Sequence, residues 1–132
     1  MFAGFTASIV WLLFGSILYL NKGVKNRYRI MRSLPGVKKW IGTSGFYLFH
    51  YIILLITSLF AAVIFSFIKP GLPESIIWQA LIFGTGICVF QTIPRVLETS
   101  LRTTYPSGLL MIEFLNYTMS GYAVALTLAF LI

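Results

Sequence analysis

The sequence predicts an all-α integral membrane protein, with four transmembrane helices in a small antiparallel bundle and both termini on the outer side. Three observations predict this fold class. Hydrophobic residues make up 58% of the 132 residues, charged residues make up 10%, and Asp is absent. Soluble domains of this size are rarely so apolar. Four long stretches carry no charge, and the basic residues gather in the connections between them.

The four uncharged stretches cover residues 1–20, 46–68, 75–94 and 114–132. At a rise of 1.5 Å per residue, each one reaches roughly 30 Å, the thickness of the hydrocarbon core. Each stretch is continuously apolar, whereas the strands of a membrane barrel alternate over about ten residues. We therefore expect a single domain over 1–132, with helices near 2–20, 45–68, 75–102 and 108–131.

The first uncharged stretch is expected to be a retained anchor. A secretory signal begins with positively charged residues, and the first base of this chain is Lys22. Small residues recur here at helical spacing, with Ala3 before Ala7 and Gly4 before Ser8. Such pairs let another helix approach closely. This face is expected to pack within the chain or against a partner protein.

The connection 21–44 is strongly basic, and it also contains apolar residues such as Trp40. Pro35 and Gly36 divide it. The mixture suits either a solvated cytoplasmic loop or a surface-lying segment whose bases meet anionic lipid, at about 1 kcal/mol per base. The expected anionic-lipid surface consists of seven bases: Lys22, Lys25, Arg27, Arg29, Arg32, Lys38 and Lys39.

The distribution of bases predicts the orientation. The second connection has one base, Lys69, accompanied by Glu74, whereas the third brings Arg95 and Arg102. By the positive-inside rule, the first and third connections are cytoplasmic, or face the matrix in an organelle. We expect a prokaryotic inner membrane protein with both termini facing outward. The net charge of +7 then reflects topology, so nucleic acid is not an expected partner.

The third helix is expected to continue past its apolar part as a polar stripe. Pro94 lies inside it, removes a backbone donor and should kink the helix near Phe90. The stripe has spacings of four, three and four, which place its members on one helical face. Its members are Gln91, Arg95, Glu98 and Arg102.

The fourth helix carries a matching polar face, formed by Glu113, Asn116 and Tyr117 at spacings of three and four. Because the third connection is short, the third and fourth helices should be antiparallel neighbours. Glu98 then lies beside Glu113. Arg95 lies beside Asn116, within reach of both carboxylates.

The second helix adds Tyr47 and His50 near the same end. Counting from the helix ends places all these groups near the inner edge of the hydrocarbon. One inner-leaflet polar cluster is therefore predicted. Its members are Tyr47, His50, Gln91, Arg95, Glu98, Glu113, Asn116 and Tyr117.

Two roles remain open for this cluster. Ionisable groups inside a membrane are rare and are usually paired or functional. Arg95, Glu98 and Glu113 could neutralise one another and lock the third helix to the fourth. Alternatively, the cluster could form a pocket for a lipid headgroup, a quinone-like ring or a small anion, with Arg95 as its charge anchor.

No cofactor or metal is expected. His50 is the only histidine, so haem would need Met111, Met119 or a second subunit as its other ligand. Met119 lies about a turn and a half deeper than Glu113, which disfavours such a pairing. Cys88 is the only cysteine, which excludes an intrachain disulfide or a cysteine metal cluster.

The sequence also lacks known catalytic motifs. There is no Asp, no HExxH and no phosphate-binding loop of the Walker type. We expect a small non-enzymatic accessory or assembly subunit of a larger membrane complex. An oligomeric small transporter or channel is the first alternative, and a membrane-embedded lipid-modifying enzyme is the second. The expected partners are membrane lipids, including anionic headgroups, and other membrane subunits or further copies of the chain.

Overall fold

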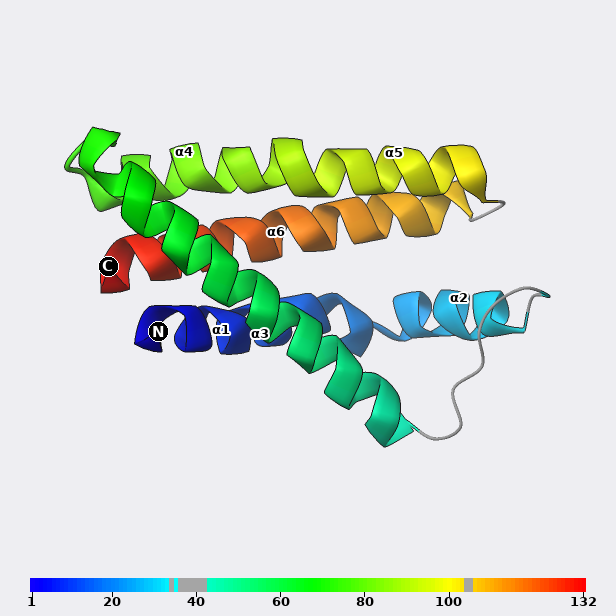
Figure 1. The fold of residues 1–132 in the computed structure, drawn as a ribbon. Helices are drawn as coiled ribbons and strands as arrows, with labels where there is room; N and C mark the ends of the chain where they lie inside the picture. The colour runs from blue at the N-terminus through cyan, green and yellow to red at the C-terminus, as the bar shows by residue number, and fades with distance from the viewer. Residues whose placement is uncertain (34, 36–42, 104–105) are drawn as a thin grey trace.

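The computed structural model describes residues 1–33, 35, 43–103 and 106–132, and this part of the chain is helical with no strand (Figure 1). The all-helical class predicted from the sequence is confirmed. Four helical spans are long and apolar enough to cross a membrane. They run over Phe2–Leu20, Ser44–Gly71, Ile76–Arg102 and Ser107–Leu131.

The first span consists of α1 (Phe2–Ile17) and a closing 3₁₀ turn (Leu18–Leu20). Its small residues are buried, and α1 packs against α3 on one side and α6 on the other. A Cβ atom on Gly4 would lie 2.9 Å from the Leu59 side chain of α3. Glycine is therefore needed here for the close approach of the two helices.

A short helix, α2 (Lys22–Arg32), follows directly. Asn21 takes an extended backbone conformation, and its side chain accepts a hydrogen bond of 2.9 Å from the Gly23 amide, which is a helix N-cap. We had expected a connection without a helix here. α2 continues in the direction of α1 (Figure 1), so its basic residues extend away from the first span.

The second span, α3 (Thr43–Ile68), crosses the others obliquely (Figure 1). It packs on α1, and near its C-terminal end Phe65 meets Phe83 of α4 edge-on, with ring centroids 5.0 Å apart. α3 ends in a 3₁₀ turn, Lys69–Gly71, where Pro70 supports the change of direction.

The third span has three parts: α4 (Ile76–Ile87), the π-helical segment η3 (Cys88–Thr92) and α5 (Ile93–Arg102). The Ile93 amide donates to the Cys88 carbonyl, five residues back. In a regular α-helix, Pro94 would leave the Phe90 carbonyl without a donor and its ring would clash there. The wider π turn accommodates the proline at the place where the sequence predicted a kink.

The fourth span, α6 (Ser107–Leu131), lies between α1 and α4 and contacts both. Its contact faces use small residues: a Cβ on Gly121 would lie 3.2 Å from Ile87, and a Cβ on Gly84 of α4 would overlap the ring of Tyr122. Ala125 is fully buried. The small residues Gly84, Gly121 and Ala125 thus lie in helix contacts.

Candidate functional site

Glu113 on α6 is held by a tyrosine from outside the apolar spans. The Tyr28 hydroxyl of α2 donates to Glu113 Oε1 at 2.9 Å. Tyr19, in the turn that ends the first span, donates to the Tyr28 hydroxyl at 3.4 Å, and the two rings lie 5.1 Å apart. Because Tyr28 and Glu113 are both part-buried, this chain of hydroxyls fastens α2 to α6.

Arg95 on α5 lies over an aromatic ring of α6. Its guanidinium carbon is 4.6 Å from the centroid of Tyr117. A cation over a ring contributes about 0.5–1 kcal/mol at exposed sites and more where water is excluded. The contact therefore links α5 to α6 just after the π-helical segment.

Asn116 lies on the side of α6 that faces α1, away from Arg95. Only 6% of its surface is exposed, and its Nδ2 donates to the Gly15 carbonyl of α1 at 3.1 Å. One turn of α6 thus has polar contacts to both α1 and α5.

These side chains form what we call the polar layer. The polar layer joins parts of the first, third and fourth spans and α2. Its members are Tyr19, Tyr28, Arg95, Glu113, Asn116 and Tyr117.

Glu98 and Gln91 do not join the polar layer through any contact in the described part of the chain. Glu98 Oε1 pairs instead with Arg102 Nη1 at 3.3 Å, one turn further along α5, and both side chains are mostly exposed. Gln91 is exposed in the π-helical segment.

Tyr47 and His50 are exposed on α3. The His50 ring stacks on Phe46, with centroids 6.0 Å apart and planes at 8°. No hydrogen bond joins His50 to any residue that the structure describes. Within the described residues, neither Tyr47 nor His50 has a hydrogen bond, ion pair or ring contact to the polar layer.

Two members of the polar layer, Tyr19 and Tyr28, were missed from the sequence. The available signal was local: Asn21 is a favourable N-cap for a helix that begins at Lys22. Such a helix brings Tyr28 back beside the inner part of α6.

The described bases of the expected anionic-lipid surface all lie on α2, and all five are exposed. Arg27 also covers the start of α6, because a Cβ atom on Gly108 would lie 2.9 Å from Arg27 Nη1. Lys38 and Lys39 lie outside the described residues. The members on α2 are Lys22, Lys25, Arg27, Arg29 and Arg32.

The chemistry of the polar layer is that of hydrogen bonds and cation–π contact between helices. Within the described ranges, no three His, Cys, Asp or Glu side chains come together as a metal site. Cys88 lies 3.7 Å from the Thr118 hydroxyl across the α4–α6 side of the molecule.

Comparison with protein-family models, curated proteins and solved structures found no match for the chain. The class of protein is therefore inferred from the helices alone. Four of them are long and apolar enough to cross a membrane, consistent with an integral multi-pass membrane protein.

Proposed function

We propose that this chain is a small non-enzymatic accessory or assembly subunit of a larger membrane complex, with both termini facing outward. The proposal rests on the exposure of large side chains in the first half of α3. Its side chains are exposed in several directions: Tyr47 is 60% exposed, Leu48 60%, Phe49 56% and Ile53 61%. Lipid or another polypeptide must cover them in a membrane.

The presence of His50 among these side chains supports a polypeptide, rather than lipid, as the molecule that covers this part of α3. His50 lies about 9 Å beyond Ser44, the first residue of its span, at 1.5 Å per residue. Polar side chains at such depth usually face protein, because hydrocarbon offers them no hydrogen bonds. The expected occupant is a transmembrane helix of another subunit, carrying a side chain that bonds to His50 or Tyr47.

The polar layer fits a structural role in this proposal. Glu113, Asn116 and Arg95 already have partners within the chain, so a ligand would have to displace them. We assign the polar layer the locking of α2 and α5 to α6. This leaves the exposed part of α3 as the surface available to a partner.

Anionic lipid is the second proposed partner, at the start of α2. Because α2 continues in the direction of α1, Arg32 lies about 18 Å past Leu20, beyond the Debye length of about 8–10 Å. Lys22 and Lys25 lie within that length. They should therefore contribute most of the attraction to anionic headgroups.

Photocrosslinking in the native membrane tests the subunit proposal. We expect benzoylphenylalanine at position 50 to give a crosslink to one distinct polypeptide. The same residue at Leu81, which is 43% exposed on α4, serves as the matched control and should give no such product. Native mass measurement after mild extraction should find the same polypeptide. Recovery of the chain only as a homo-oligomer would contradict the proposal and favour the channel alternative.

A further inference from the structure

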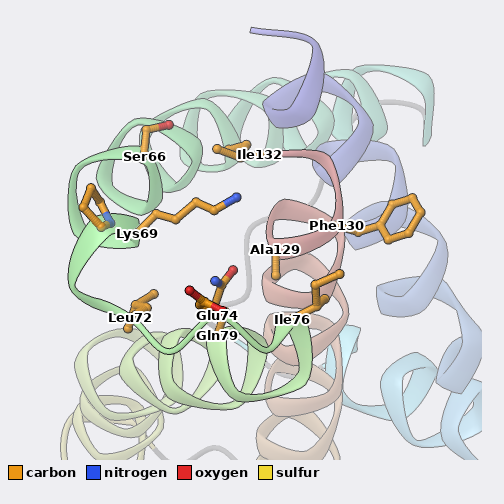
Figure 2. A pocket seen from close by; sticks show the side chains of 10 residues that line it. Ser66, Lys69, Leu72, Glu74, Ile76, Gln79, Ala129, Phe130 and Ile132 are labelled. Atoms are coloured by element: carbon orange, nitrogen blue, oxygen red, sulfur yellow. The ribbon is translucent and has the colours of Figure 1, made fainter.

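A second polar feature lies at the opposite end of the molecule from α2. There the turn between α3 and α4 and the last turn of α6 line an open hollow of about 650 Å³ (Figure 2). This volume falls within the range of about 300–1,000 Å³ that is usual for small-molecule sites. Three polar side chains among those that line it carry the argument: Lys69, Glu74 and Gln79.

Gln79 has an unsatisfied acceptor in this hollow. Only 5% of its surface is exposed, and its Nε2 donates to the Pro73 carbonyl at 2.8 Å. A carbonyl can only accept, so this bond fixes which way the amide points. Its Oε1 is left buried, without a hydrogen-bond partner among the described residues. Because buried polar atoms in proteins nearly always have a hydrogen-bond partner, this oxygen is expected to accept a hydrogen bond from a donor.

Lys69 and Glu74 provide opposite charges beside Gln79. Figure 2 shows the Lys69 ammonium directed into the hollow from one side, with Glu74 and Gln79 at another. In the described part of the chain, neither charge has an ion-pair partner within 4.0 Å, and the two do not pair with each other. The hollow therefore has one cation on one side and, on the other, a carboxylate and the buried, unpartnered amide oxygen of Gln79.

We propose that this hollow binds a phosphoethanolamine group, and that its source is the headgroup of a membrane lipid. The phosphate accepts from Lys69. The primary ammonium donates to Glu74 and to Gln79 Oε1, which supplies the missing partner. A choline headgroup has no N–H and leaves Gln79 unsatisfied, while a phosphoglycerol headgroup has no cation for Glu74.

The position of the hollow supports a lipid source. Span two ends at Gly71 and span three begins at Ile76, so the turn between them lies at the membrane boundary, where headgroups are found. A second hollow of about 390 Å³, mostly apolar in its lining, lies between α1 and α6 and shares Phe130 with the first. It offers a place for an acyl chain beside the bound headgroup.

Short-chain lipids of matched acyl length test the proposal on the purified full chain in detergent. We expect dihexanoyl phosphatidylethanolamine to bind at least tenfold more tightly than dihexanoyl phosphatidylcholine, as measured by calorimetry. Gln79→Met should abolish this preference, whereas Lys69→Met should weaken the binding of both lipids, because both carry the phosphate that accepts from Lys69. Ser66→Ala is the matched control, because Ser66 lines the same hollow but its hydroxyl bonds to Ala62 within its own helix.

Two further measurements keep the proposal falsifiable if a variant fails to fold. Equal binding of the two lipids by the unmodified chain would overturn it. Soluble O-phosphoethanolamine should bind at least tenfold more weakly than the lipid, because it lacks the acyl chains. If it bound as tightly, the chemistry of the hollow would stand but the lipid source would be wrong. These outcomes do not depend on whether another subunit covers α3.

Discussion

α6 and the span built on α3 can each cross a membrane, yet they bury very different shares of their residues. The most apolar 18-residue window of the α6 span has a mean hydropathy of 1.3, and 39% of that window is buried. For the α3 span the corresponding values are 2.6 and 22%. The more hydrophobic helix is the less buried one, which is the reverse of the rule for soluble proteins.

The physical reason is the solvent. Lipid tails are as apolar as leucine, so burying a leucine against another helix gains little in a membrane. Close packing and interhelical hydrogen bonds drive association instead. α6 has the residues for both, namely Gly121, Ala125 and Asn116, whereas α3 presents mostly large apolar side chains. Each prediction below contrasts a position at the α6 contacts with a matched position on α3.

The largest effect is expected from a glycine in the α4–α6 contact. Gly84→Leu should lower the free energy of unfolding by about 3 kcal/mol, because the new side chain overlaps Tyr122 and forces the helices apart. Gly45→Leu on α3 should change it little, since nothing lies within 4 Å of a Cβ there. Equilibrium unfolding in mixed micelles measures both. Equal losses would show that α3 is packed as tightly as α6.

A smaller effect is expected from the hydroxyl that ties α2 to α6. Tyr28→Phe removes the donor to Glu113 and should cost about 1.5 kcal/mol of stability, as for hydrogen bonds to charged groups. Hydrogen exchange along α2 should accelerate as well. Tyr47→Phe on α3 is the control and should leave both measurements unchanged in the isolated chain. Unaltered exchange in α2 after Tyr28→Phe would contradict the locking role.

The smallest change in the free energy of unfolding is expected from replacing a buried serine. Unlike the two changes above, this one should increase stability. Ser58 on α3 is fully buried, and its hydroxyl has no partner among the described residues. Ser58→Ala should therefore raise the free energy of unfolding by about 1 kcal/mol. Ser120 on α6 is also buried, but its hydroxyl bonds to the Asn116 carbonyl at 2.7 Å. Ser120→Ala should not stabilise the chain, and a gain as large as that of Ser58→Ala would contradict this account.

The candidate site was predicted in part. Of the cluster expected from the sequence, Arg95, Glu113, Asn116 and Tyr117 belong to the polar layer, because the short connection makes α5 and α6 neighbours and the three α6 residues lie within about one helical turn. Their partners could not be predicted in the same way. The register count placed Asn116 beside Arg95, but Asn116 bonds instead to Gly15 on the other side of α6.

Two other features depend on geometry that spacing does not reveal. The predicted Pro94 kink takes the form of a π-helical segment, whose extra residue shifts the helical register of α5 against that of α4. α2 brings Tyr28 to Glu113 only because a new helix begins after Asn21 and lies beside α6. Both effects change which side chains can meet without changing the apolar pattern.

The sequence by itself determined the class of the protein and the positions of its four spans. That information is local, since a run of apolar residues either reaches across the hydrocarbon core or does not. The tertiary structure alone decided which helix became central, which partners the polar groups found, and that Gln79 was left with an unsatisfied oxygen. Those outcomes depend on how the helices cross and rotate against one another, and small residues and hydrogen bonds set that geometry once lipid removes the hydrophobic drive.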